Sequence, residues 1–242
     1  MRADMFLVDK GLASSRQKAK ELIETGSVTA NGQLVKKPSQ TIQSNAAITI
    51  DSPLTDWVSR GALKLLGGLE AFPHISLEGK IAVDLGASTG GFTQVLLRKG
   101  AQHVFAIDVG HGQMAPHLAD DSRVTMHEKC NARDLSQHHI TLPVDIIVCD
   151  VSFISLVLAL PAAMDMALPG AHMIALIKPQ FEVGRQGLDK GGIVKDDALR
   201  AGAVTKIQDF MESKNWQVLG TTASPVKGPD GNQEYLMAAV KR

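Results

Sequence analysis

Features that mark several protein classes are scarce in this chain of 242 residues. Its two cysteines, Cys130 and Cys149, are too few for a disulfide framework or a four-cysteine zinc site, and they fit a reducing compartment. The formal net charge is zero, so a nucleic-acid-binding surface would need a local group of basic residues. The longest apolar run, Ile154–Leu160, is too short to span a bilayer, and no signal-peptide segment follows Met1. We therefore expect a cytoplasmic protein without a membrane segment or a metal ion.

The composition indicates a folded protein with more than one part. Hydrophobic residues make up 44% of the chain and charged residues 21%, which is typical of globular domains. The length fits either one large domain or one ordinary domain plus a small one. A polar stretch interrupted by proline follows residue 50. We predict a small domain at 1–52, a linker at 53–58 and a larger domain at 59–242.

A glycine-rich turn between two apolar strands organises the larger domain. The predicted strand Ile81–Leu85 leads into the turn Gly86–Gly91, which opens a helix. A second predicted strand, His103–Ile107, ends on Asp108. Such a βαβ unit is typical of sites for adenosine-containing cofactors, because the turn lets the backbone approach the ligand and the acid accepts the ribose hydroxyls.

The acid that precedes this turn favours one cofactor over another. Asp84 would repel the diphosphate of a dinucleotide, whereas it suits the cationic amino-acid end of S-adenosylmethionine, which has no phosphate. A nicotinamide enzyme and a purely structural turn are the alternatives. Glu128 and Asn131-Ala132-Arg133 follow the third strand, where such folds usually contact adenine. The predicted cofactor-binding residues are Asp84, Gly86, Ser88, Thr89, Gly90, Gly91, Phe92, Asp108, Asn131, Ala132 and Asp150.

The remaining apolar segments predict an open α/β sheet. Further strands are expected at Val124–Met126, Val144–Cys149, His172–Ile177, Trp216–Gly220 and Glu234–Val240. We expect a helix that ends near Leu168, before Pro169-Gly170, and another from about Asp196 to Ser213. No helix separates the last two strands, so the final strand should be antiparallel. The predicted fold class is α/β, a Rossmann-like methyltransferase sheet with an antiparallel last strand, plus a small α+β N-terminal domain.

Charged residues stand at the ends of neighbouring predicted strands. Asp150 and Lys178 directly follow two of the parallel strands, where ligands of open α/β sheets bind. Glu234 would enter the same edge at the start of the antiparallel strand. If the helix that contains Lys64 covers this edge, two lysines and two acids converge there. Otherwise Lys64 is an ordinary exposed helix lysine.

A characteristic set of residues extends over the first 50 positions: Arg2, Leu7, Val8, Gly11, Ser15-Arg16, Ala19, Ile23, Gly26-x-Val28, Asn31-Gly32 and Lys37-Pro38-Ser39. With this set the segment resembles the S4 domain, an RNA-binding module. Ser14-Ser15 is the predicted N-cap of a helix that ends at Gly26, and Asn31-Gly32 suits a type I′ hairpin turn. The resemblance implies RNA contact by backbone and shape; a solvated basic helix face is the alternative. The predicted RNA-binding residues are Arg2, Arg16, Lys18, Lys20, Lys36, Lys37 and Arg60.

Four motifs extend over the rest of the chain: Ser59-Arg60-Gly61-Ala62-x-Lys64, Asp150-Val151-Ser152-Phe153-Ile154-Ser155-Leu156, Lys178-Pro179-Gln180-Phe181-Glu182 and Gly231-Asn232-x-Glu234. With these motifs and its first domain, the whole chain is similar to the TlyA (hemolysin A) family, whose catalytic domain resembles FtsJ-type ribose 2′-O-methyltransferases. The resemblance implies methylation of cytidine 2′-hydroxyls in ribosomal RNA or ribosomal subunits. Relatives carry an arginine before the Trp-Val pair where this chain has Thr55-Asp56, which leaves any linker role in RNA recognition open.

The resemblance implies a catalytic set of Lys64, Asp150, Lys178 and Glu234. We expect Lys178 to orient or deprotonate the ribose hydroxyl and Lys64 to place the ribose and its phosphate, while the two acids fix the lysines. A lysine can act as a base only if burial or a nearby cation favours its neutral form. Two rival functions are a membrane-lytic protein, suggested by the family's older name, and an RNA-binding assembly factor without catalysis.

Overall fold

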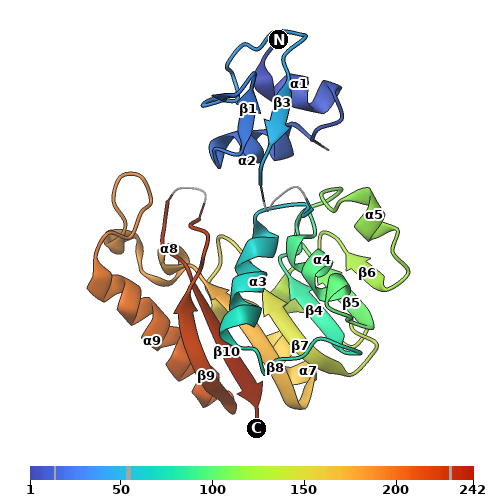
Figure 1. Cartoon of the computed structure of the whole chain (residues 1–242). Coiled ribbons are helices and arrows are strands. Elements are labelled where there is room, and N and C mark those ends of the chain that lie inside the picture. Colours follow the sequence, from blue (N-terminus) through green and yellow to red (C-terminus); the bar gives the residue numbers. More distant parts are fainter. Residues whose placement is uncertain (14, 53–55, 229–230) are drawn as a thin grey trace. The chain divides into compact units, whose positions relative to one another are not determined.

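The computed structural model describes residues 1–13, 15–52, 56–228 and 231–242. Two compact units make up the chain, Met1–Arg60 and Gly61–Arg242 (Figure 1). Residues 53–55 of the expected linker lie outside the described part, including Thr55 of the departure from the family pattern. Residues 56–60 belong to the first unit.

The first unit combines two helices with a small antiparallel sheet in the order β2-β1-β3. Its elements are α1 (Ala3–Asp9), α2 (Arg16–Glu24), β1 (Val28–Ala30), β2 (Gln33–Leu34) and β3 (Ile48–Ile50). The Ser15 hydroxyl accepts the Lys18 N–H at 3.1 Å and so caps α2, and Gly26 follows the helix with a φ of 72°. Both Asn31 and Gly32 have positive φ, as a type I′ turn requires. The predicted cap and hairpin turn are confirmed; Ser14 lies outside the described residues.

The second unit is built on a seven-stranded sheet in the order β6-β5-β4-β7-β8-β10-β9 (Figure 1). Its strands are β4 (Ile81–Leu85), β5 (His103–Ile107), β6 (Val124–His127), β7 (Val144–Cys149), β8 (Ala167–Ile177), β9 (Trp216–Ala223) and β10 (Tyr235–Lys241). The first five strands across the sheet are parallel, and β10 pairs antiparallel with both β8 and β9. The predicted fold class is confirmed, including the antiparallel last strand.

Short and long helices connect these strands. The α-helices are α3 (Gly61–Ala71), α4 (Gly91–Arg98), α5 (Pro116–Ala119), α6 (Leu156–Ala159), α7 (Pro161–Met166), α8 (Pro179–Glu182) and α9 (Asp197–Ser213). Two 3₁₀ helices, η1 (Ala132–Asp134) and η2 (Arg185–Gly187), lie near the carboxyl ends of strands. Asp196 caps α9 by accepting the Ala198 N–H at 2.8 Å, which agrees with the predicted start of that helix.

The prediction of one helix that ends near Leu168 is wrong. Pro161 occupies the first turn of a new helix, α7, which ends at Met166. Ala167 is already extended and begins β8, so Pro169 and Gly170 lie inside an eleven-residue strand. The first part of β8 is mostly exposed, which is where a strand tolerates proline.

The two faces of the sheet pack against different helices. Alternate residues of neighbouring strands, such as Val83 and Met173, belong to the main hydrophobic cluster together with Ile207 and Met211 of α9. The intervening residues face the other side, because side chains alternate along a strand. Ile174 of β8 and Leu236 of β10 lie on that side, against α3. A core of this kind leaves the strand ends free to form a site.

Two glycines let α3 lie close to the sheet. A Cβ atom at Gly68 would lie 3.2 Å from Ile174 and 3.6 Å from Leu236. A Cβ atom at Gly67 would lie 2.6 Å from the Pro225 ring. Because α3 also contains Lys64, this close approach sets the position of a predicted catalytic residue.

We predict that Gly68→Val lowers the free energy of unfolding by about 1–3 kcal/mol, because the added side chain overpacks the contact between α3 and the sheet. Gly202→Ala is the control: Gly202 lies on the exposed face of α9 with open space around its Cβ position, and this change should stabilise slightly. Urea unfolding measures both. Equal free energies of unfolding for the two variants would show that Gly68 is not needed for the close contact between α3 and the sheet.

Candidate active site

One carboxylate lies between two buried lysines at the edge of the sheet. Asp150 directly follows β7, and its Oδ1 lies 2.7 Å from Nζ of Lys178, which directly follows β8. Its Oδ2 lies 3.8 Å from Nζ of Lys64 on α3. Both lysine residues are only 8% exposed. The helix α3 therefore reaches this edge of the sheet, as the predicted meeting of the two lysines and two acids requires.

The fourth predicted residue completes this cluster from the antiparallel strand. Glu234 directly precedes β10, is fully buried, and places Oε2 2.7 Å from Nζ of Lys64. A Cβ atom at Gly228 would lie 2.7 Å from Oε1 of Glu234, so the loop before the strand packs directly on the carboxylate. In space, the four side chains follow one another in the order Lys178, Asp150, Lys64, Glu234, so that positive and negative charges alternate.

Lys178 has additional partners in the segment that follows β7. Its ammonium donates to the Ser152 hydroxyl at 2.7 Å and lies 3.4 Å from the Asp150 carbonyl oxygen. These contacts fix the direction in which Nζ points, because an ammonium has three donors and no acceptor. Ser152 lies in the predicted motif, although sequence reasoning assigned it no role.

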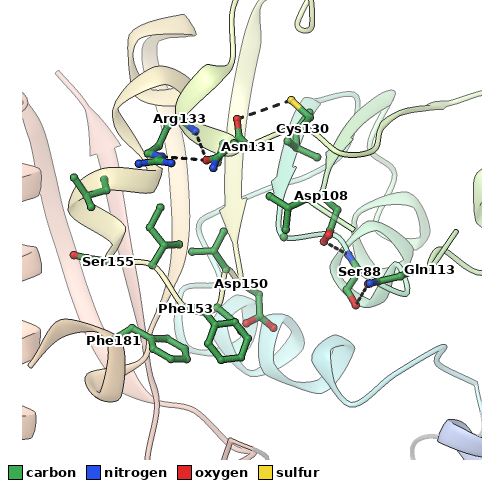
Figure 2. A pocket seen from close by; sticks show the side chains of 18 of the residues that line it. Ser88, Asp108, Gln113, Cys130, Asn131, Arg133, Asp150, Phe153, Ser155 and Phe181 are labelled. Carbon is green, nitrogen blue, oxygen red and sulfur yellow. Dashed lines mark hydrogen bonds between the residues drawn. The ribbon is translucent and has the colours of Figure 1, made fainter. Parts of the chain in front are cut away.

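A cavity of about 980 Å³ includes Asp150 of this cluster in its wall, and Figure 2 shows the side chains that line it. It lies beyond the carboxyl ends of β4, β5 and β7, where Gly86, Asp108 and Asp150 follow the strands. Six predicted cofactor-binding residues line it: Gly86, Ser88, Asp108, Asn131, Ala132 and Asp150. The cavity and the lysines share Asp150, so a ligand in the cavity would lie next to the cluster.

The acid at the end of β5 organises the turn around it. Asp108 Oδ2 accepts the Ser88 N–H at 2.8 Å, and Oδ1 accepts the Gly110 N–H at 2.6 Å. Each oxygen keeps a further lone pair, so the carboxylate can also accept hydroxyl groups of a ligand. Val109 beside it is 68% exposed and lines the cavity, which provides an apolar surface.

Gly86 and Asp84 show how the turn after β4 is packed against its neighbours. Gly86 has a φ of 83°, and a Cβ atom there would lie 2.8 Å from the Asp150 carbonyl oxygen. Asp84 is fully buried: its Oδ2 accepts the Thr93 hydroxyl at 2.6 Å, while its Oδ1 has no hydrogen-bond partner among the described residues. Burial raises the pKa of Asp84 to about 7, and the nearby Asp150 carboxylate adds to this.

Five predicted cofactor-binding residues do not line the cavity: Asp84, Thr89, Gly90, Gly91 and Phe92. Phe92 is a core residue, 3% exposed, because the first turn of α4 directs it inward. Gly90 has a φ of 93°, and a Cβ atom there would lie 2.5 Å from Leu118. Arg133, which follows the third strand as expected, also lines the cavity. Further lining residues, most of them shortly after predicted strands or in quoted motifs, received no role from the sequence: Ile107, Val109, Gln113, Cys130, Val151, Ser152, Phe153, Ile154, Ser155, Leu158, Phe181 and Arg185.

An exposed aromatic residue stands at the rim of the cavity. Phe153 is 91% exposed and has a φ of 65°, a conformation that is rare for a bulky residue. Its ring lies 5.3 Å from that of Phe181, centroid to centroid (Figure 2). Backbone strain of this kind is common at functional sites, and the exposed ring face is free for stacking.

In the first unit, Lys18 differs from the prediction. It is 7% exposed, and its ammonium donates to the Trp57 carbonyl oxygen. Lys18 shares the buried side of α2 with Ala19 and Leu22, because residues four apart lie on the same face of a helix. Burial lowers the pKa of Lys18. It therefore does not belong to an exposed basic face.

The other predicted RNA-binding residues reach the surface to different degrees. Lys36 and Lys37 are exposed, whereas Lys20 and Arg60 are half-buried. Arg2 and Arg16 each place a guanidinium nitrogen 3.0 Å from the buried carboxylate of Asp4. The hydrogen bonds from these arginines lower the pKa of Asp4. The two arginines remain partly exposed.

Comparison with known proteins agrees with the geometry of both units. The profile of the FtsJ-like methyltransferase family matches residues 57–241, and that of the S4 domain matches residues 1–48. A 16S/23S rRNA (cytidine-2′-O)-methyltransferase TlyA of Mycobacterium tuberculosis is 47% identical over 240 residues, which cover 98% of this chain and 88% of the relative. The chain belongs to the TlyA family of FtsJ-like methyltransferases. The resemblance noted from the sequence is confirmed.

Other relatives of this TlyA-family chain carry two kinds of name. A 23S rRNA (cytidine-2′-O)-methyltransferase TlyA of Campylobacter jejuni is 36% identical, with both chains fully covered. A hemolysin A of Brachyspira hyodysenteriae is 39% identical over 98% of each chain. The structure of a Streptococcus thermophilus protein named as a hemolysin has a TM-score of 0.80 and 36% identity, covering 100% of this chain and 88% of that one. Among the described residues, no helix has the length and apolar character needed to cross a membrane.

The residues of this TlyA-family chain fit S-adenosylmethionine. Gly86 and Ser88 bring the backbone of the turn to the wall of the cavity, and Asp84 lies fully buried behind this wall. Asp108 can accept ribose hydroxyls, and Val109 offers an apolar face for adenine. In the described part of the chain, no group of three or more His, Cys, Asp or Glu side chains could hold a metal ion.

We predict that Asp84 makes the stability of the second unit pH-dependent. Because its pKa is raised from 3.8 to about 7 in the fold, the folded chain retains a proton that the unfolded chain loses. The resulting stabilisation is present at pH 4 and is lost as the pH rises through 7; it amounts to at most about 4 kcal/mol. In Asp84→Asn, which does not titrate, this part of the pH dependence should disappear.

Chemical unfolding of the cofactor-free protein between pH 4.5 and 7.5 measures the effect. Asp121→Asn is the matched control, because the hydrogen bonds from Arg123 keep the pKa of Asp121 at about 2, below this window. If the free energy of unfolding changed with pH in the same way in the wild type and in Asp84→Asn, Asp84 would not carry the proton in the folded chain.

Proposed function

We propose that this protein transfers the methyl group of S-adenosylmethionine to a ribose 2′-oxygen of ribosomal RNA, with cytidine as the target nucleoside. The observation that carries the proposal is the ion-paired set Lys178, Asp150, Lys64 and Glu234 beside a cavity that fits the methyl donor. Two relatives, from Mycobacterium tuberculosis and Campylobacter jejuni, support cytidine in ribosomal RNA as the target, since both are named rRNA (cytidine-2′-O)-methyltransferases. Isolated ribosomal RNA or an assembled subunit in the cytoplasm would serve as substrate.

The reaction needs a ribose hydroxyl placed in line with an activated methyl group. S-adenosylmethionine supplies that methyl on a positively charged sulfur. Lys178 Nζ, fixed by Asp150 and Ser152, orients the hydroxyl. Only a Lys178 in its neutral form accepts the hydroxyl proton as the oxygen–carbon bond forms, because an ammonium has no acceptor. Lys64, anchored by Glu234, provides a second cation next to the same carboxylate and places the ribose and its phosphate.

The rim of the cavity supports RNA as the substrate. Phe153 offers an exposed ring on which a nucleobase can stack, as aromatic residues do in single-stranded RNA recognition. Arg133 and Arg185 also line the cavity and bring positive charge to the rim. In the first unit, the exposed Lys36 and Lys37 would contact phosphates.

We predict that Lys178→Ala lowers kcat for methyl transfer by about 100-fold or more, because the hydroxyl loses the group that orients and deprotonates it. The affinity for S-adenosylmethionine, measured by calorimetry, should change less than about threefold, since Lys178 does not line the cofactor cavity. The assay uses labelled methyl donor and ribosomal RNA from a strain that lacks this protein.

Lys214→Ala at the exposed end of α9 is the control and should retain full activity. Mapping the product should place the label on a ribose 2′-oxygen. Cofactor binding without methyl transfer by the wild type would favour an assembly factor instead, and near-normal transfer by Lys178→Ala would refute its role.

We also predict that the double change Lys36→Ala and Lys37→Ala weakens RNA binding in a sequence-independent way. Each lost phosphate contact should reduce the slope of log K against log salt by about 1. Fluorescence anisotropy between 50 and 200 mM salt would measure this, with Lys99→Ala in the second unit as control. An unchanged salt slope would exclude these two lysines from the RNA surface.

A further inference from the structure

The segment Lys178-Pro179-Gln180-Phe181-Glu182 ends in an acid that the proposed reaction does not use. The Glu182 side chain is 1% exposed and closes the short helix α8. Its Oε1 accepts the Leu156 N–H at 2.8 Å, and its Oε2 accepts the Ser155 hydroxyl at 2.6 Å. A carboxylate buried with such partners is held in one orientation.

The positive charge that balances Glu182 comes from α9. Lys206 donates from Nζ to Oε2 of Glu182 at 2.8 Å and to its backbone carbonyl oxygen at 3.0 Å. The same ammonium lies 3.5 Å from the Ser155 hydroxyl. A buried carboxylate requires such a partner, because an isolated charge is costly to remove from water. Glu182, the last residue of α8, is therefore bonded to two other elements, α6 and α9.

These contacts connect Glu182 with the segment that fixes Lys178. Residues 150–156 contain Asp150 and Ser152, which lie at one end and contact the Lys178 ammonium. The other end of the segment, Ser155 and Leu156, is bonded to Glu182. Since Lys178 precedes α8 and Glu182 ends it, one short helix is attached to both ends of the segment.

We propose that Glu182 is a positioning residue that acts through residues 150–156. It keeps this segment against α8, so that Asp150 and Ser152 hold the Lys178 ammonium toward the ribose hydroxyl. Phe153 lies between the two attachment points in its rare positive-φ conformation, which surrounding contacts have to stabilise. The inference rests on the proposed function for its effect on catalysis, whereas the attachment itself can be measured separately.

The test compares Glu182→Ala and Glu182→Gln in the full chain. Hydrogen exchange of backbone amides in peptides that cover 150–158 reports the attachment, and kcat at saturating cofactor and RNA reports its consequence. In Glu182→Ala we expect exchange in these peptides to rise about tenfold while the central strands remain protected, and kcat to fall about tenfold or more. Glu182→Gln keeps an oxygen for the Leu156 N–H and should recover most of the lost kcat.

Glu212→Gln is the matched control, because Glu212 is an exposed acid on α9 whose carboxylate accepts a hydrogen bond from the Gln208 side-chain amide at 3.4 Å. It should behave as the wild type. If Glu182→Ala does not fold, Lys206→Met removes one of the donors to Glu182 and should give a smaller change in the same direction.

Three results would overturn the inference: unchanged exchange in 150–158, unchanged kcat in a variant whose segment exchanges faster, or faster exchange spread evenly over the sheet. The last result would show a contribution to overall stability alone. If the wild type transfers no methyl group to RNA, the proposed function fails, and the exchange measurement still decides whether Glu182 holds the segment.

Discussion

The site depends on one carboxylate that two lysines share. Asp150 contacts Nζ of Lys178 at 2.7 Å and lies 3.8 Å from Nζ of Lys64. Two ammonium groups in a partly buried crevice repel each other, and an acid between them offsets that repulsion. Glu234 adds the second negative charge on the far side of Lys64, so the four groups together are neutral. This neutrality allows two lysine side chains, each only 9% exposed, to lie beside the same carboxylate.

The geometry of the sheet brings these groups together. The carboxyl ends of parallel strands lie at one edge, which accounts for Asp108 after β5, Asp150 after β7 and Lys178 after β8. The antiparallel pairing of Tyr235 with Ile177 sets the preceding residue, Glu234, opposite Lys178. The spacing of apolar residues along the chain is sufficient to predict these strand ends. The positions of Asp108, Asp150 and Lys178 could therefore be predicted from the sequence alone.

The remaining features depend on tertiary contacts that a single sequence does not contain. The buried position of Lys18 follows from its carbonyl partner on Trp57, 39 residues away. Phe92 belongs to the same glycine-rich segment as Gly86 and Ser88, which line the cavity. Only the packing of α4 shows that Phe92 is a core residue. Pro169 and Gly170 usually end a helix, and here they lie in the exposed beginning of a strand. The role of Glu182 depends on Lys206 and Ser155, neither of which is near it in sequence.

The most direct test of the shared carboxylate is a double-variant cycle on methyl transfer with Asp150→Asn, Lys178→Ala and the combination. If Asp150 acts by holding Lys178, the two residues form one unit, and the combined variant should be no slower than the slower single variant. Rate losses that multiply in the combined variant would mean that the two residues act independently, and would contradict a site organised around their contact.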